Sequence, residues 1–235
     1  MSVASKLPVA NRLIESLPLN ERDRILLCCE TVELVFGDIL CEPHEPFEYV
    51  YFPLTGFISL VTTLSGHKPL EMGLIGNEGM FGVTLALEVD ALPMRAVVQG
   101  PGTALRISTA QLRSELSGCP RLRRMLNRYL YLLLSQLSLT AACTHFHEIE
   151  PRLARWLLLT HDRAHADHFH LTHEFLAGML GVRRSGVTIA AGALQVKNLI
   201  HYTRGEISIL DRRGLEAASC ECYDAVMGDY ARLLA

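Results

Sequence analysis

The stretch that decides the fold is Leu171–Gln195, which reads LTHEFLAGMLGVRRSGVTIAAGALQ. Thr172 is a good helix N-cap, because its hydroxyl can accept from the free amides of the next turn. Apolar residues then recur at helical spacing, and the small Ala177 lets a second helix cross close by. Gly181 supplies the turn, since glycine tolerates a positive φ, and Val187 falls on the inner face of the second helix. The stretch predicts a helix-turn-helix, whose second helix can enter the major groove of DNA.

The segment that follows predicts a small β-hairpin beside the second helix. Tyr202 and residues 207–210 are strand-like, and Arg204-Gly205 between them is a hairpin turn signal. A helix-turn-helix followed at once by a β-hairpin is a winged helix. Taken alone, Leu171–Gln195 could also be an ordinary pair of packed helices. The hairpin that follows makes this alternative less favoured.

Composition and charge fit a two-part protein. The 235 residues are enough for two domains, and 49% hydrophobic residues supply their cores. The net charge of −3 looks wrong for a DNA-binding protein, but its distribution matters more than its sum. From Leu171 to Arg213, six basic residues oppose three acidic ones, a local charge of +3 that leaves −6 for the rest. This split is typical of an acidic sensor joined to a basic DNA-binding domain.

Several classes of protein are disfavoured. Seven cysteines occur with no signal peptide ahead of them, so reduced thiols in the cytoplasm are expected. The leucine-rich run at 126–143 contains Asn127, Arg128 and Gln136, which argues against a membrane span. No nucleophile elbow, phosphate loop or zinc-protease motif is present, and we expect no enzymatic activity.

Two kinds of pattern divide the N-terminal half. Residues up to about 30 indicate two short helices separated by Pro18-Leu19-Asn20. From Thr31 to about Ser108, short apolar runs alternate with glycine, proline and asparagine, which predicts an antiparallel sandwich or roll. These runs are Val32–Phe36, Tyr49–Phe52, Phe57–Thr62, Leu70–Leu74, Ala96–Val98 and Ala104–Ile107.

Residues from Arg121 to about Cys143 predict a long helix with two apolar stripes. One stripe holds Leu122, Leu126, Tyr129 and Leu133, and the other holds Leu130, Leu134 and Leu137. A helix that is apolar on two sides must be covered on two sides. We expect one side to pack on the roll and the other on the same helix of a second subunit. Burial within a single subunit is the alternative.

Two further helices are expected in the C-terminal half. Residues 149–163 predict one, with Pro151 in its first turn. The histidine-rich segment 161–170 is interpreted as a polar connection to the helix-turn-helix. After the hairpin, Asp211 is expected to cap one last helix that runs through Leu233.

The order of helix, roll, long helix and winged helix resembles the cyclic-AMP receptor protein / fumarate-nitrate regulator (Crp/Fnr) family of bacterial transcription factors. The resemblance runs from about Val32 to Leu210 and is strongest in LTHEFLAGMLGVRRSGV. VYFPLTGFISLV resembles the early strands of the family's roll. GNEGMFG, followed by PMRAVV, resembles the region that holds a cyclic-nucleotide phosphate.

The resemblance implies an α+β fold and a division of the chain. Residues 1–120 would form a sensor, an antiparallel β-roll of the cyclic-nucleotide-binding jelly-roll type with N-terminal helices. Residues 121–145 would form a dimerisation helix, and residues 146–235 a winged helix-turn-helix with a C-terminal helix. The family implies a homodimer that binds a palindromic promoter site in double-stranded DNA. RNA polymerase is a further partner if the protein activates transcription, although no residue identifies the contact.

The region that resembles a cyclic-nucleotide site departs from the family pattern. Nucleotide-binding members follow a glycine with a glutamate that accepts from the ribose hydroxyl, whereas Gly82 is followed by Val83. Arg95 stands where the family places the arginine that pairs with the phosphate, and Ala96 replaces a hydroxyl donor. The predicted ligand-contacting residues are Gly79, Phe81, Gly82, Val83, Arg95 and Ala96.

Losing one such polar partner costs about 1–3 kcal/mol, so we expect cyclic AMP to bind weakly or not at all. No cofactor is assigned, and a different small effector, or none, would govern the sensor. An ion pair on the surface or at a dimer interface is the alternative role for Arg95.

The family's base-contacting motif keeps only its first arginine, at Arg184, while Ser185 and Ile189 replace a glutamate and a later arginine. Arg184 can bind guanine O6 and N7. Ser185 and Thr188 can reach bases or phosphates, and the other basic residues are expected at phosphates. The predicted DNA-contacting residues are Thr172, Arg183, Arg184, Ser185, Thr188, Lys197 and Arg204. A protein–protein adaptor that has lost DNA binding is an alternative, and the local charge of +3 argues against it.

Histidines offer an alternative function as a metal sensor. Seven of the ten lie in the range 145–173. His161 and His165 are four residues apart, a spacing at which two side chains of one helix can share a metal, and His168 and His170 are possible further ligands. A polar segment exposed between two domains is the preferred interpretation.

Cysteines offer the related alternative of a redox or iron–sulfur sensor. Cys28, Cys29 and Cys41 do not match the spacing of a four-cysteine cluster, and they are interpreted as buried structural thiols. His44 and His67 are single histidines in the roll and are weak candidates for haem ligands. The sequence analysis therefore assigns no metal ligand.

Overall fold

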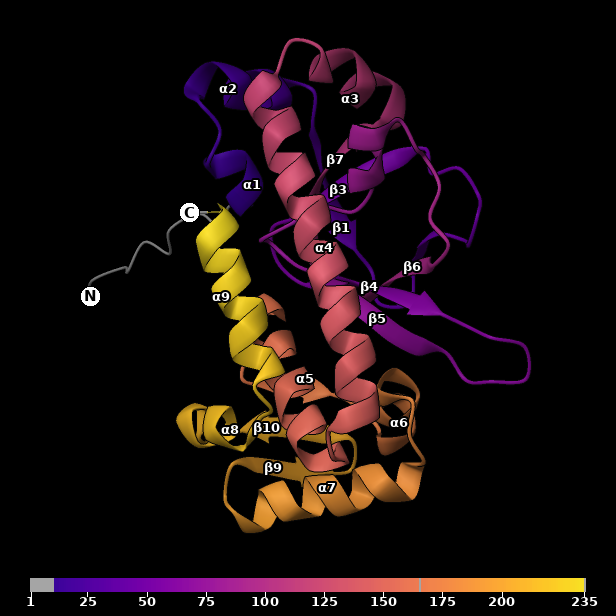
Figure 1. Ribbon diagram of the computed structural model, residues 1–235, viewed down its shortest axis with the longest axis vertical. Helices are drawn as coiled ribbons and strands as arrows, with labels where there is room; N and C mark the ends of the chain where they lie inside the picture. Colours follow the sequence, from indigo (N-terminus) through magenta and orange to yellow (C-terminus); the bar gives the residue numbers. More distant parts are fainter. Residues whose placement is uncertain (1–10, 165, 235) are drawn as a thin grey trace.

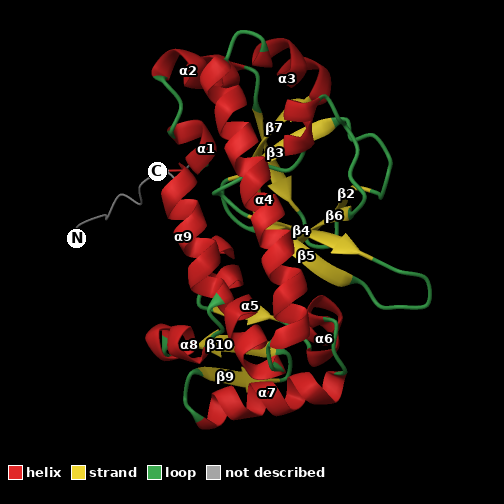
Figure 2. Ribbon diagram, viewed as in Figure 1, coloured by secondary structure: helices red, strands yellow, loops and turns green. Residues whose placement is uncertain are grey.

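The computed structural model describes residues 11–164 and 166–234. The roll and the winged helix lie toward opposite ends of the molecule, and the long helix runs beside the roll along the long axis to the winged helix (Figures 1 and 2). The first elements are α1 (Arg12–Glu15) and α2 (Leu19–Leu27). The predicted break falls at Pro18, whereas Leu19 and Asn20, which were expected in the break, begin α2. Asn11 caps α1 by accepting from the backbone amides of the first turn.

The roll consists of two antiparallel sheets with a shared apolar core. One sheet has the strand order β1-β7-β3, and the other has the order β2-β6-β4-β5. All six predicted runs form strands, whereas the three-residue β2 was too short to be predicted. The strands are β1 (Glu30–Leu34), β2 (Ile39–Cys41), β3 (Tyr49–Pro53), β4 (Phe57–Thr62), β5 (Leu70–Ile75), β6 (Arg95–Gly100) and β7 (Gly102–Ser108).

Large side chains from both sheets fill the core of the roll. Phe52 and Ile107 come from one sheet, Ile58 and Leu74 come from the other, and all four are at most 2% exposed. Phe81 adds a fully buried ring from the segment before the short 3₁₀ helix η1 (Val83–Leu87). After the last strand of the roll, α3 (Thr109–Leu116) leads to the long helix.

The long helix α4 (Pro120–Phe146) packs one apolar stripe against the roll. Leu122, Leu126 and Tyr129 are fully buried, whereas Leu134 of the second stripe is 65% exposed. Gly79 permits the close approach of roll and helix, since a Cβ there would lie 1.9 Å from the Tyr129 hydroxyl oxygen. The prediction that one side of this helix covers the roll is confirmed.

The C-terminal part begins with α5 (Ile149–Ala164) and contains a winged helix. Its helices are α6 (His173–Leu180) and α7 (Arg184–Val196), and its strands are β8 (His168–His170), β9 (Ile200–Thr203) and β10 (Glu206–Ile209), in the sheet order β8-β10-β9. The histidine-rich segment is therefore more than the expected connection. Its end pairs with β10 and gives the wing a third strand.

The prediction of one continuous helix after Asp211 is wrong, because the structure has two helices there. Asp211 does cap a helix, but this is the short α8 (Arg212–Ala218), which ends before Cys220. A second helix, α9 (Cys222–Leu234), then runs back beside α4 in the opposite direction (Figure 1). Ser135 Oγ of α4 donates to Asp229 Oδ2 of α9 at 2.7 Å. The chain breaks the helix because α9 must turn to pack on α4.

A membrane-spanning helix must be both long and apolar. None of the helices of the described residues combines the length and the apolar character that crossing a bilayer needs.

Candidate nucleic-acid interface

The turn between α6 and α7 has the predicted geometry. Thr172 Oγ1 accepts from the amide of Phe175 at 3.1 Å and so caps α6. Gly181 ends the helix with φ 64°, and the amide of Val182 donates to the carbonyl of Ala177 at 2.9 Å, the closing bond of a Schellman motif. Ala177 is 1% exposed where the two helices cross. The stretch is a helix-turn-helix.

One face of α7 is open to solvent. Arg184, Ser185, Thr188 and Ile189 are all exposed, and their spacing along the helix places them on the same side. Arg183, at the N-cap position, is exposed next to them. Basic, hydroxyl and apolar groups are therefore presented together on the outer surface of the second helix.

The hydroxyl of Thr188 is engaged within the protein. It donates to the carbonyl of Arg184 at 3.1 Å, and it lies 2.9 Å from Nδ1 of His173. The His173 ring stacks on Tyr202 of β9, with the ring centroids 4.2 Å apart. Burial and the charge of Arg184 lower the pKa of His173, which favours a neutral ring that donates from Nδ1 to Thr188. This contact fixes α7 relative to α6 and the wing.

The remaining predicted contacts lie on both sides of this face. Arg204 and Gly205 form the tip of the wing with φ 49° and 89°, a two-residue turn with both central φ positive, and Arg204 is exposed there. Lys197 follows α7 and forms an ion pair with Glu150 of α5. The structure thus brings all seven predicted residues to one end of the molecule, with Lys197 already paired.

The predicted ligand-contacting residues lie in the roll, and most of them are buried. Phe81, Val83 and Ala96 are at most 3% exposed, with their side chains in the core of the roll. Gly82 has φ 88°, and a Cβ there would lie 2.4 Å from a Val50 methyl carbon. Among the side chains of this group, only Arg95 is substantially exposed.

The guanidinium of Arg95 is part of an ion pair on the roll. Arg95 Nε lies 2.8 Å from Glu42 Oε2, and the two side chains are 43% and 36% exposed. The arrangement matches the alternative role for this arginine, an ion pair on the surface of the roll.

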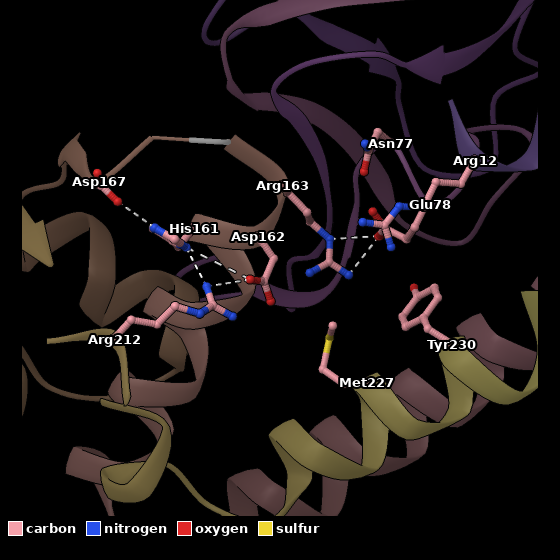
Figure 3. A pocket seen from close by; sticks show the side chains of 10 residues that line it. All are labelled: Arg12, Asn77, Glu78, His161, Asp162, Arg163, Asp167, Arg212, Met227 and Tyr230. Carbon is pink, nitrogen blue, oxygen red and sulfur yellow. Dashed lines mark hydrogen bonds and ion pairs between the residues drawn. The ribbon is translucent and has the colours of Figure 1, made fainter. Parts of the chain in front are cut away.

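Of the histidines considered as metal ligands, His161 lines a cleft of about 440 Å³ between the roll, α5, α8 and α9 (Figure 3), whereas His170 lies 2.6 Å from Glu206 on the wing. His161 Nε2 lies 2.8 Å from Asp167 Oδ1, and its Nδ1 lies 2.6 Å from a guanidinium nitrogen of Arg212. Both ring nitrogens of His161 are therefore occupied. His165, the other half of the predicted pair, lies outside the described residues.

A buried hydrogen-bonded chain connects the roll to the C-terminal part, and sequence reasoning missed it. Trp156 Nε1 of α5 donates to Glu71 Oε1 of β5 at 2.7 Å. Ser59 Oγ lies 2.8 Å from both Glu71 Oε2 and Gln99 Oε1. One serine proton can serve only one acceptor at a time: Ser59 donates to Glu71 when the carboxylate is ionised, and when Glu71 is protonated its carboxyl can donate to Ser59, which then donates to Gln99. In the sequence, the only signals of this chain of hydrogen bonds are the single tryptophan, Trp156, and a glutamate within an apolar run, Glu71.

Burial determines the charge state of this glutamate. Glu71 is surrounded by protein, and desolvation raises its pKa to about 7 although the bonds from Ser59 and Trp156 act in the opposite direction. Glu71 is therefore close to half-protonated at neutral pH.

Comparison with protein families matches both parts of the chain. The cyclic nucleotide-binding domain matches residues 31–118, and the Crp-like helix-turn-helix domain matches residues 151–218. None of the curated proteins matches the chain. These two domains are those of transcription regulators and not of enzymes.

Several solved structures have the same fold, and the alignment with this chain covers nearly the whole length of each. CLP, the c-di-GMP responsive global regulator of Xanthomonas campestris, has a TM-score of 0.65 at 18% identity, with 82% of this chain and 99% of that chain covered. FixK2 from Bradyrhizobium japonicum has a TM-score of 0.68 at 17% identity, with coverages of 82% and 98%. TTHA1359, a Crp/Fnr family transcriptional regulator from Thermus thermophilus, has a TM-score of 0.62 at 21% identity, with coverages of 81% and 98%.

These structures show the fold, whereas the two matched domains identify the family. A cyclic nucleotide-binding domain and a Crp-like helix-turn-helix stand in this order on one chain, on either side of a long helix. The protein belongs to the Crp/Fnr family of DNA-binding transcription regulators.

Proposed function

We propose that the protein regulates transcription as a homodimer that inserts α7 of each subunit into the major groove of a palindromic DNA site. In this proposal residues 1–120 form the sensor, residues 121–145 dimerise and residues 146–235 bind DNA. The observation that carries the proposal is the exposed row Arg184, Ser185, Thr188 and Ile189 on α7. Side chains on one open face of a recognition helix can reach base edges together.

The residues of this row would have different roles at the DNA. Arg184 is assigned to guanine, since its guanidinium can bond O6 and N7 together. Ile189 is 74% exposed, and such an apolar side chain suits the methyl group of thymine. Ser185 is placed next to Arg184, where its hydroxyl can bond a base or a phosphate. Thr188 would present its methyl group, because its hydroxyl is engaged with His173.

The basic residues around the row are assigned to phosphates. Arg183 precedes α7 and Arg204 forms the tip of the wing, so the two would grip the backbone on either side of the groove. Lys197 would have to leave Glu150 to join them. Thr172 serves as the cap of α6 and places the amide end of that helix near the backbone.

The outer face of α4 supports the dimer. Tyr131 and Leu134 are 53% and 65% exposed, whereas the opposite stripe is buried against the roll. Packing two such faces together would remove this apolar surface from water. A dimer would present two copies of α7 to half-sites about 34–36 Å apart, one turn of DNA. RNA polymerase would be a partner only in activation.

We further propose that the roll does not bind cyclic AMP in the family's usual way. Val83 supplies no acceptor for a ribose hydroxyl, and Arg95 is already paired with Glu42. Titration calorimetry with cyclic AMP and cyclic GMP tests this. We expect no binding at micromolar concentrations, and tight binding that depends on Arg95 would contradict the proposal.

The experiment that tests the DNA assignment is selection of binding sites from random duplex DNA by the wild-type protein and by Arg184→Ala. We expect the wild type to select a palindrome and the variant to lose its preference at one symmetric pair of base positions, with a loss of about 1–3 kcal/mol. Arg113→Ala, which removes an exposed arginine on α3, outside both the DNA-contacting residues and the dimerisation helix, is the matched control and should leave the selected site unchanged. If Arg184→Ala selects the same site as the wild type, the assignment of α7 is wrong.

A further inference from the structure

We propose that Cys143, His147, Cys220 and Cys222 bind one zinc ion, which ties the end of α4 to the segment between α8 and α9. These four side chains are distant in the sequence and meet in the fold. Nothing in the sequence interpretation or in the proposed DNA contacts uses them. The proposal therefore stands apart from the DNA-binding function.

The distances between the four ligand atoms fit a single metal ion. All four atoms lie within 4.8 Å of one another. Cys143 Sγ lies 3.6 Å from Cys220 Sγ, and Cys222 Sγ lies 3.7 Å from His147 Nδ1. In a tetrahedral zinc site with Zn–S bonds of about 2.3 Å, neighbouring sulfur atoms are about 3.8 Å apart. The side chains need only small shifts to close around the ion.

The other nitrogen of His147 has the partner that a metal ligand requires. His147 Nε2 lies 3.1 Å from Glu221 Oε1. A histidine that binds a metal through one nitrogen usually donates its other N–H to a carboxylate or a carbonyl, which fixes the tautomer and the ring orientation. Glu221 lies between Cys220 and Cys222, so the same short segment supplies two ligands and the support for a third.

A buried positive charge next to the cysteines balances the site. Three thiolates, one neutral imidazole and Zn²⁺ carry one net negative charge. Arg155 is 8% exposed, and its Nε and Nη1 have no hydrogen-bond partner among the described residues. Its charge is close enough to interact with the thiols of Cys143, Cys220 and Cys222. Bound thiolates would compensate this arginine, two of whose nitrogens otherwise stay buried without a hydrogen-bond partner among the described residues.

The donor set favours zinc over the alternatives. Three cysteines and one histidine that close around one point form a common structural zinc site, with no position left open for water. An iron–sulfur cluster needs its cysteines spread over several irons. A disulfide needs a sulfur–sulfur distance of about 2.05 Å and would leave the third cysteine and the histidine without a role. The three cysteines are buried, as expected for a structural site.

The position of the site defines what the zinc would hold. Cys143 and His147 are one helical turn apart at the end of α4, where the backbone becomes extended at His147 before α5 begins. Cys220 and Cys222 lie where the chain turns from α8 into α9. Zinc would therefore lock the corner between the long helix and the C-terminal part, and would hold α9 against α4.

Elemental analysis of the full-length protein, purified under reducing conditions without a metal-affinity step, tests the proposal. We expect one zinc per chain in the wild type and a small fraction of that in Cys220→Ser/Cys222→Ser. The matched control is Cys28→Ser/Cys29→Ser, which removes two cysteines outside the cluster and should keep the zinc. If the wild type binds no zinc even after zinc is added to the reduced protein, the proposal is wrong. It is also wrong if the cluster variant keeps its zinc, or if iron is bound in place of zinc.

Two measurements on the wild type keep the test valid if the cluster variant fails to fold. X-ray absorption at the zinc edge should show three sulfur ligands and one nitrogen ligand. Replacement of zinc by Co²⁺ should give the intense visible absorption of a tetrahedral ion with thiolate ligands. Zinc surrounded only by oxygen and nitrogen, or a disulfide between Cys143 and Cys220 in the freshly isolated protein, would overturn the proposal.

Discussion

The guanidinium of Arg163, near the end of α5, forms a buried ion pair with the carboxylate of Glu78 in the segment after β5, with Arg163 Nε 2.8 Å from Glu78 Oε1. The two side chains are 3% and 9% exposed. Arg163 also donates to the carbonyl of Leu159 at 3.0 Å. One pair of charges therefore connects the first helix of the DNA-binding part to the roll, at the edge of the cleft in Figure 3.

Breaking this pair should destabilise the protein strongly. Glu78→Gln removes one charge and leaves Arg163 buried without a counterion, so the free energy of unfolding should fall by about 3–5 kcal/mol. Chemical denaturation followed by Trp156 fluorescence measures it. Glu30→Gln is the control, because it breaks the more exposed pair with Arg106, and should cost at most about 1 kcal/mol. Equal losses in the two variants would show that the buried pair does not stabilise the fold.

Glu71 predicts a specific dependence of stability on pH. Its pKa is about 7 in the folded protein and 4.5 without the protein environment. Between these values the folded state holds a proton that the unfolded chain has lost, so the stabilisation is complete below pH 4.5 and falls as the pH rises through about 7. A shift of this size corresponds to about 3 kcal/mol.

Glu71→Gln isolates this contribution. The amide can accept from Trp156 and donate to Ser59, but it does not titrate. The unfolding free energy of the wild type, relative to that of Glu71→Gln, should therefore decrease from pH 5 to about pH 8. Asp224→Asn, at an exposed position on α9, is the control and should parallel the wild type over this range. A constant difference between the wild type and Glu71→Gln would mean that Glu71 is ionised throughout.

The wing should contribute to DNA affinity without contributing to sequence preference. Arg204→Ala removes one phosphate contact, so binding should weaken by a similar factor on every sequence. The slope of log affinity against log salt concentration should decrease by about 1. Fluorescence anisotropy at several salt concentrations measures both, with Arg113→Ala on α3 as the unaffected control. A change in the selected sequence instead would place Arg204 at a base.

The outer face of α4 should determine the oligomeric state. Leu134→Glu places a charge at the proposed dimer interface, so the variant should sediment as a monomer and bind the full DNA site much more weakly. Leu64→Glu is a matched control, because Leu64 is 67% exposed on the loop between β4 and β5, against 65% for Leu134. If Leu134→Glu remains a dimer, α4 is not the interface.

Sequence patterns predicted the elements that depend on short stretches of chain. Thr172 caps α6, Gly181 makes the turn, and Arg204-Gly205 makes the hairpin, each as expected. In these cases the preference of one residue for a cap or for a positive φ fixes the backbone locally. The short β2 and β8 carried too few residues for a pattern, and the break between α8 and α9 depends on where α9 packs.

The candidate sites also include some features that the sequence predicted and others that only the fold revealed. The row on α7 follows from helical spacing within a few residues, so Arg184, Ser185 and Thr188 were identified before the fold was known. Val83 and the residue pattern around it indicated a degenerate nucleotide site, but only the fold placed Arg95 beside Glu42.

By itself, the sequence determined the helix-turn-helix, the wing and the strands of the roll, because periodicity, caps and turns act over a few neighbouring residues. The tertiary structure alone decided which distant polar groups meet. Glu71 and Trp156 are 85 residues apart in the chain, and Cys143 and Cys220 are 77 apart. Contacts at such separations depend on how α4, α5 and α9 pack, and no local preference of the backbone encodes that packing.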